Sequence, residues 1–115
     1  MLAVRVLGCS GSYAAAGGAC TGYLAQSTGA NVWLDAGPGT LSNLQRHARL
    51  GDLDAIVLTH AHPDHWLELP VVANALEWYE RRDPLPVFSN AHTFGEVREL
   101  IGDSITAVFD WTIVG

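Results

Sequence analysis

The segment DAIVL, from Asp54 to Leu58, is a short continuous apolar run that leads directly into the polar segment THAHPDH. A strand that is apolar at every position is typical of a sheet covered on both sides. Helical patterns recur between this run and the later apolar segments, which excludes a Greek-key or all-β arrangement. The sequence therefore predicts an α/β fold, with helices packed on a sheet.

Apolar spacing and turn residues predict the order of elements. A first strand and a second strand are joined by a long Gly- and Ser-rich loop, and the second strand forms a hairpin with a third. Pro38 is expected to open the first helix, and Pro70 to break or kink the start of the second. The predicted strands cover residues 3–7, 22–26, 32–35, 54–58, 84–89 and 105–114, and the predicted helices cover residues 38–50, 68–82 and 93–101.

Length and composition indicate one small folded domain of 115 residues, with 49% hydrophobic residues and a mean hydropathy of +0.17. No apolar run approaches the ~20 residues of a membrane span, and the N-terminus lacks signal-peptide features, so we expect a cytoplasmic protein. Twelve acidic residues against six arginines give a net charge of −6, which argues against binding to nucleic acid or an anionic membrane. Cys9 and Cys20 are interpreted as reduced packing residues.

Three of the five histidines fall between residues 60 and 65, together with one carboxylate. Imidazole and carboxylate groups suit zinc or iron. His60 and His62, two residues apart on an extended chain, can converge on one ion. Asp64 and His65 can reach a second point nearby if the chain turns there. The spacing favours two metals that share a water molecule over a surface loop with incidental histidines.

The segment THAHPDH matches the H-x-H-x-D-H signature of the metallo-β-lactamase-fold hydrolases. The resemblance extends along the chain: VLGCSGS is similar to the first strand and loop of that family, LDAGPGT to the third strand and its glycine turn, and LDAIVLTH to the strand entering the metal loop. The Leu69–Pro70 pair resembles the ribonuclease Z-like phosphodiesterase branch. Trp66 and Glu68 stand where that branch has small residues, which argues against tRNA 3′-end processing.

The resemblance implies that His60 and His62 bind a first zinc ion and that Asp64 and His65 bind a second, with manganese or iron as alternatives. It also implies that Asp64 orients or deprotonates the nucleophilic water. Asp35 would hold the histidines in orientation, its alternative being a strand-end aspartate that starts a turn.

The remaining histidines and tryptophans carry weaker expectations. His47 is expected on a solvated helix face and His92 in a loop. Trp33, Trp78 and Trp111 are expected in the core or an interface, and Trp66 at the wall of the site.

The family fold is a sandwich of two sheets covered by helices, and it is built from two halves. Residues 1–115 resemble the N-terminal half of this αββα sandwich, a mixed sheet with helices on one face. The resemblance implies further metal ligands in the second half, yet no histidine follows His92. The chain is therefore expected to be truncated, either as an expressed piece of a longer protein or as the product of a shortened gene.

Two hypotheses of function remain open. The first is a dinuclear zinc hydrolase of phosphodiesters or other esters, with a small-molecule or nucleotide substrate, whose isolated 115-residue part is inactive. The second is a non-catalytic remnant that folds, forms homo-oligomers through its exposed sheet face and binds metal weakly or not at all. A di-iron oxidoreductase is disfavoured, because that branch has glutamate at the position of His62.

Overall fold

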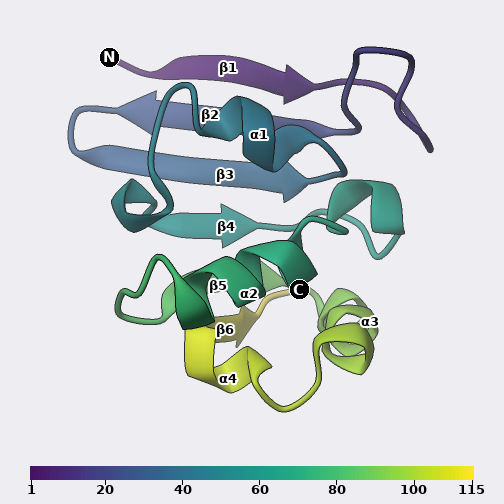
Figure 1. Ribbon diagram of the computed structural model, residues 1–115, viewed down its shortest axis with the longest axis vertical. Coiled ribbons are helices and arrows are strands. Elements are labelled where there is room, and N and C mark those ends of the chain that lie inside the picture. Colours follow the sequence, from purple (N-terminus) through teal and green to yellow (C-terminus); the bar gives the residue numbers. More distant parts are fainter.

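The computed structural model describes all residues from Met1 to Gly115 and contains one six-stranded sheet, whose strands lie side by side in sequence order (Figure 1). The strands are β1 (Ala3–Gly8), β2 (Gly22–Ser27), β3 (Ala30–Ala36), β4 (Ala55–Val57), β5 (Leu85–Ser89) and β6 (Phe109–Ile113). The helices are α1 (Thr40–Leu44), α2 (Leu69–Trp78), α3 (Ala91–Ile101) and α4 (Ile105–Val108), with single 3₁₀ turns at η1 (Leu50–Asp52) and η2 (Pro63–His65).

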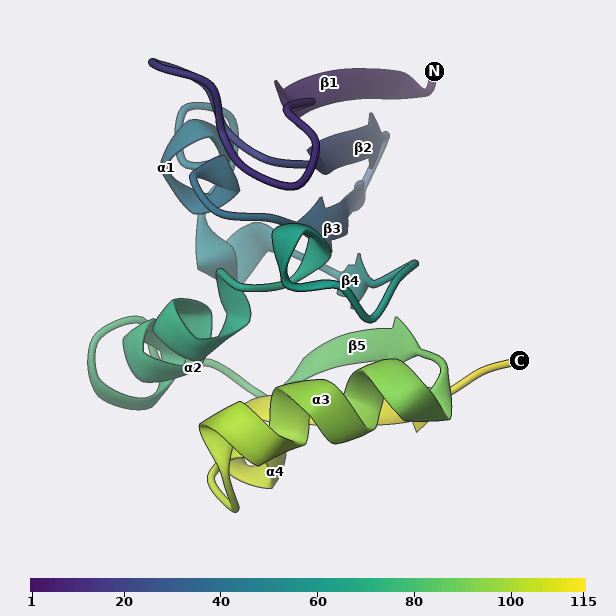
Figure 2. The ribbon, with the colours of Figure 1, turned by 90° about the vertical axis from the view of Figure 1, so that its right-hand side faces the viewer.

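The sheet is mixed: β1, β2 and β3 pair antiparallel, and β3 to β6 pair parallel. Each parallel connection passes through at least one helix, and the helices lie on one face of the sheet (Figure 2). The predicted α/β class and the mixed sheet with helices on one face are therefore confirmed. None of the helices is long and apolar enough to cross a membrane.

A row of cross-strand neighbours forms the core beneath the helices. Leu24, Trp33, Ile56 and Val87 are paired in register across four adjacent strands, and all four are fully buried. Trp111 continues the row on β6, where its ring meets Phe94 of α3 edge to face at 5.2 Å. Cross-strand packing of this kind stabilises a sheet chiefly by removing apolar surface from water.

The last predicted strand, residues 105–114, is wrong over its first four residues, which form α4. Ile105 and Val108 lie three residues apart, so in a helix both face the same side, and both are buried. The apolar run ITAVF fits either conformation, and contact with α2 selects the helix.

The first predicted helix is too long, and one tryptophan, Trp78, lies outside the core. Regular helix ends at Leu44, and the chain then turns so that the buried Leu50 enters η1. Trp78 ends α2 with 61% of its surface exposed, which excludes the core and leaves the predicted interface role as a prediction, whereas Trp33 is fully buried as predicted. Pro70 opens α2 in its first turn, where its missing N–H is not needed.

From β1 to β5 the sheet face opposite the helices is apolar, and no helix covers it; on β6 this face carries Asp110 and Thr112. One row on this face, Val6, Tyr23, Leu34, Val57 and Phe88, crosses five strands in register. We call the surface formed by this row and its apolar neighbours the open face; its members are Val4, Val6, Tyr23, Ala25, Val32, Leu34, Ala55, Val57, Pro86 and Phe88. At the β1 edge Val4 and Val6 are 56% and 63% exposed.

We propose that the isolated 115-residue chain self-associates through the open face, because contiguous apolar patches of more than a few hundred Å² are rare on monomers. Sedimentation velocity at high micromolar concentration is expected to show dimers or larger species. The double substitution Val4→Lys and Val6→Lys places two charges on the patch at exposed positions, and it is expected to shift the distribution to monomer. A clean monomer for the unaltered chain would contradict this proposal.

Candidate metal centre

The loop that leaves β4 carries four of the predicted site residues and folds back on itself. His62 has extended backbone dihedrals, and Pro63 then opens η2, in which the His65 N–H donates to the His62 carbonyl at 2.9 Å. This single turn brings His65 back over His60, so that the two ring centroids lie 4.4 Å apart. The turn therefore makes neighbours of histidines that an extended loop would separate.

Asp35 reaches the same place from β3 through a β-bulge. Gly22 pairs with Ala36 and Tyr23 pairs with Leu34, so Asp35 is the extra residue of β3 and has no partner on β2. It is the one residue other than glycine with a positive φ, 59°. Aspartate tolerates this left-handed conformation better than most residues, and a bulge re-aims its side chain. The bulge turns the carboxylate toward the end of β4.

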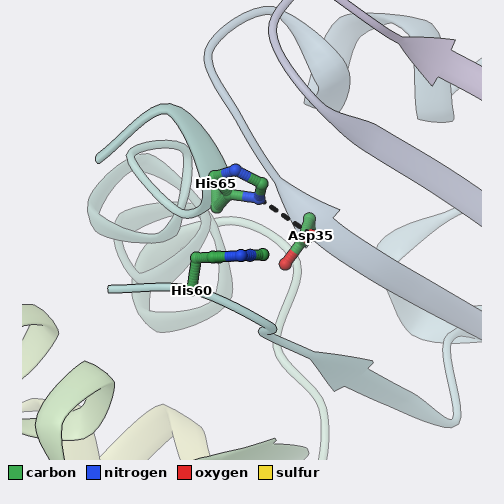
Figure 3. A group of neighbouring side chains, drawn as sticks. All are labelled: Asp35, His60 and His65. Carbon is green, nitrogen blue, oxygen red and sulfur yellow. Dashed lines mark hydrogen bonds and ion pairs between the residues drawn. The ribbon is translucent and has the colours of Figure 1, made fainter. Parts of the chain in front are cut away.

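The Asp35 carboxylate is only 4% exposed and accepts three hydrogen bonds. Its Oδ1 accepts from the Thr59 backbone N–H at 2.8 Å, and its Oδ2 accepts from the Thr59 hydroxyl at 2.6 Å. The same Oδ2 lies 3.0 Å from Nδ1 of His65 (Figure 3). A buried carboxylate is tolerated where donors surround it in this way.

These contacts determine which ring nitrogens carry protons. The Thr59 hydroxyl has one proton, and this proton is donated to Asp35 because a carboxylate can only accept. Nδ1 of His60, 2.8 Å from the same hydroxyl oxygen, must then be the donor of that contact. His65 likewise donates from Nδ1 to Asp35. In the neutral form of each ring Nε2 is therefore the unprotonated nitrogen, and this is the form that binds a metal ion.

The donor atoms fit a divalent ion of borderline softness. Asp35, His60 and His65 each offer a ligand atom within 4.8 Å of the others. Because the Asp35 oxygens are already occupied by three donors, we interpret Asp35 as the group that orients the imidazoles and assign metal ligation to the rings. Two imidazole nitrogens with a nearby carboxylate form a donor set typical of zinc, iron or manganese sites.

Asp64 and His62 flank this group. Oδ2 of Asp64 lies 3.4 Å from Nε2 of His65, close to the ~3.3 Å that separates two ligands of one tetrahedral zinc ion. The His62 ring stacks nearly parallel to that of His60, at 18°, with centroids 6.5 Å apart. His62 and Asp64 thus lie beside the group, but they do not come close to all three of its members. His47 and His92 are exposed and do not belong to it.

Trp66 does not form an open wall of the site. Its side chain is buried, with 4% exposure, and its indole N–H donates to the Ala61 carbonyl at 2.7 Å. Ala61 lies between His60 and His62, so the indole fixes the backbone that carries them. Trp66 supports the loop from within the core.

The loops after β3 and β4 touch at Gly37. A Cβ on Gly37 would collide with the Asp64 carbonyl oxygen and would lie 2.8 Å from both Cβ of Cys20 and the Thr21 carbonyl oxygen. Only glycine permits this approach of the two backbones. The glycine turn after Asp35 thus brings its own loop against the metal loop.

Two residues of the site were given no role in the sequence analysis. Thr59 bridges Asp35 and His60, and Glu68 accepts hydrogen bonds from backbone groups beyond Asp35. The only sequence signal is that Thr59 directly precedes the first histidine and that Glu68 is an acidic residue in an otherwise apolar stretch, WLELP.

Comparison with known proteins agrees with a metal site in this loop. The sequence profile described as "Metallo-beta-lactamase superfamily" matches residues 15–104, most of the chain. This chain belongs to the metallo-beta-lactamase superfamily. The match and the structure together confirm the resemblance found in the sequence.

Relatives within the superfamily include a probable metallo-hydrolase, YhfI, from Bacillus subtilis, 44% identical over 62 residues, which cover 54% of this chain and 25% of YhfI. A ribonuclease Z from Thermococcus kodakarensis is 32% identical over 72 residues, 61% of this chain and 23% of that protein.

Solved structures of the superfamily superpose over the full chain. The crystal structure of YhfI from Bacillus subtilis matches with a TM-score of 0.86 at 26% identity, covering 100% of this chain and 46% of YhfI. A diphosphatase from the PhnP family matches with a TM-score of 0.76 at 22% identity, over 100% of this chain and 51% of that structure. The chain therefore spans about half the length of the superfamily members that it resembles.

The two cysteines differ sharply in environment. Burial raises the pKa of the Cys20 thiol above its ordinary value, and the negative charges of Asp64 and Glu68 raise it further. Cys9 is exposed, whereas Cys20 is 1% exposed. The thiolate is the reactive form, so a raised pKa lowers the reactivity of Cys20 at neutral pH.

Iodoacetamide at about pH 7.5 is therefore expected to modify Cys9 and leave Cys20 intact in the folded chain, as read by peptide mass spectrometry. Both thiols should react after denaturation. Modification of Cys20 at the rate of Cys9 in the folded chain would contradict its burial beside the metal loop.

The Gly37→Ala substitution is expected to lower the free energy of unfolding by about 1–3 kcal/mol, because the added methyl group must push the two loops apart. Gly51→Ala is the matched control, since a Cβ at Gly51 meets no atom within 4 Å. Urea denaturation measures both. Equal stability of the two variants would show that the loops separate without cost.

Proposed function

We propose that this chain is part of a metal-dependent hydrolase that cleaves phosphodiesters or related esters with two zinc ions. The observation that carries the proposal is the hydrogen-bond chain from Asp35 to His60 and His65, which engages Nδ1 of both rings and leaves Nε2 as the nitrogen that can bind a metal ion. A structural role alone does not require two adjacent histidines held in the metal-binding tautomer.

In the proposed assignment His60 and His62 bind the first ion, and Asp64 and His65 bind the second. The 3.4 Å spacing of Asp64 Oδ2 and His65 Nε2 supports the second pair. The first pair rests on the H-x-H-x-D-H resemblance, because His62 lies outside the cluster of Asp35, His60 and His65. Manganese and iron suit the same donor atoms, and we prefer zinc among these three metals.

The residues of this chain have separate roles in the proposed hydrolysis. A bound ion supplies a water molecule acidic enough to act as a nucleophile near neutral pH. Asp64 orients that water and accepts its proton. Asp35 holds His65 directly and His60 through Thr59, so that both rings keep their direction while charge develops at the site.

The relatives support a phosphorus-containing substrate, because one is a ribonuclease and another a diphosphatase. The net charge of −6 argues against a long nucleic acid and favours a small-molecule or nucleotide ester. With two free cysteines, we place the protein in the reducing cytoplasm.

The second candidate function is a non-catalytic remnant that folds and self-associates. It is favoured by the small number of ligands: the proposed assignment gives each ion two side chains, where a catalytic zinc site uses three. This argument applies to the 115 residues alone. The chain spans 46% of the YhfI structure, and a whole protein of that length could supply further metal ligands.

Zinc binding and turnover test these alternatives in one experiment. The isolated chain is expected to show partial zinc occupancy at most, because each ion has only two protein ligands. His60→Ala should reduce the residual affinity roughly tenfold or more, and His92→Ala, whose side chain is exposed and lies outside the group, should leave it unchanged. The isolated chain is expected to be inert toward bis(p-nitrophenyl) phosphate with zinc or manganese, because two ligands per ion do not fix the geometry of a nucleophilic water.

Fusion of residues 1–115 to the remaining part of Bacillus subtilis YhfI is expected to create metal-dependent turnover that His62→Ala abolishes and His92→Ala preserves. A soluble, folded chimera that binds zinc without turnover would favour the remnant. Turnover by the isolated chain, lost in His62→Ala, would show that one half of the fold is sufficient.

A further inference from the structure

Glu68 joins the two loops that form the site. Its Oε1 accepts from the backbone N–H of Gly39 at 3.0 Å and of Leu41 at 2.9 Å. Its own N–H donates to the Ala36 carbonyl at 3.0 Å. One residue at the end of the metal loop therefore makes three hydrogen bonds to the segment that follows Asp35.

The helix that Glu68 contacts cannot cap itself. α1 has five residues, begins after Gly39 in the left-handed conformation, with φ 92°, and has no side-chain cap of its own. A helix this short is not stable in isolation, and its first N–H groups need acceptors. A carboxylate at the N-terminus satisfies two of them and interacts favourably with the helix dipole. Glu68 therefore supplies from 29 residues away the cap that α1 lacks.

These bonds close a ring around the pair that orients the site. Ala36 directly follows Asp35, and Glu68 lies three residues after His65. The hydrogen bond from the Glu68 N–H to the Ala36 carbonyl therefore joins the same two chain segments as the hydrogen bond between His65 and Asp35. Between these two hydrogen bonds, Gly37 of the first segment lies against the Asp64 carbonyl of the second. A displacement of Glu68 would therefore change the spacing of Asp35 and His65.

We propose that Glu68 is a positioning residue of the metal site: by tying the loop after β3 to the end of the metal loop, it holds Asp35 and His65 at hydrogen-bond distance. The inference rests on the proposed function only for its metal readout, because the ring of hydrogen bonds is made entirely by residues of the chain.

Three variants of the 115-residue chain test this inference. Glu68→Ala removes the acceptor, and Glu68→Gln keeps a side-chain oxygen where Oε1 lies. Arg82→Ala is the control of matched type, since the Arg82 guanidinium also bridges two backbone carbonyls, those of Leu50 and Leu53, at the opposite end of β4. It is expected to lower stability and to leave the metal loop unchanged.

The first readout is nuclear magnetic resonance of the metal-free chain. Glu68→Ala is expected to abolish the exchange protection of the Gly39 and Leu41 amides and to convert His65 from the single Nδ1–H tautomer to a mixture, visible in its ring nitrogen shifts. Glu68→Gln should retain both signals, and so should Arg82→Ala.

The second readout is the zinc dissociation constant, measured by competition with a chromophoric chelator. Glu68→Ala is expected to weaken binding about 10–100-fold, the range found for residues that orient metal ligands, with Glu68→Gln close to the unaltered chain. Loss of amide protection with an unchanged His65 tautomer would overturn the inference and leave Glu68 as a helix cap alone. If no form of the isolated chain binds zinc, the remnant is favoured over the proposed function, and the His65 tautomer still decides the role of Glu68.

Discussion

The carboxylate of Asp35 is the group on which the site depends. It is buried, it carries a charge, and its position on a bulge aims it away from β3 and toward β4. A charge in that place requires donors, and the chain supplies them from the Thr59 backbone, the Thr59 hydroxyl and the His65 ring. Because each donor belongs to the loop after β4, satisfying the carboxylate also sets the geometry of the histidines. The strained φ of Asp35, at a cost of about 1 kcal/mol or more, persists because these partners hold it.

The frame around this carboxylate follows from the packing of the sheet. The fully buried row from Leu24 to Val87 holds β2 to β5 in register, so the carboxyl ends of β3 and β4 meet at one edge. Ligand sites of open α/β sheets lie outside such ends. The site of this chain has the same placement, with the bulge of β3 on one side and the turn of η2 on the other.

Much of this frame could be predicted from the sequence, because it is encoded locally. Apolar runs such as AIVL and VWL, and the turn between β2 and β3, depend on neighbours a few residues apart. The histidine spacing likewise indicated metal chemistry, and the superfamily assignment is confirmed. The segment from Ile105 to Val108 was assigned wrongly because its apolar residues fit a strand and a helix equally, and only contact with α2 decides between them.

The finer parts of the site were not predictable by the same means. Thr59 and Asp35 are 24 residues apart, and Glu68 and Gly39 are 29 residues apart, so no local pattern relates them. The roles of Thr59 and Glu68 arise only when the loops after β3 and β4 come together. Trp66 illustrates the same limit: its position next to a ligand suggested a wall, whereas its indole turns inward to the Ala61 carbonyl.

The order of strands across the sheet has a consequence for how the protein is made. Every strand lies beside its predecessor in the sequence, from β1 at one edge to β6 at the other. A chain emerging from the ribosome at ~5–20 residues per second can therefore extend the sheet by one strand at a time, without leaving a gap for a later segment to fill. The antiparallel hairpins of β1, β2 and β3 need only short-range closure and come first. Because Asp35 leaves the ribosome before Thr59 and His65, the strand that carries the acceptor is available when β4 and its loop emerge.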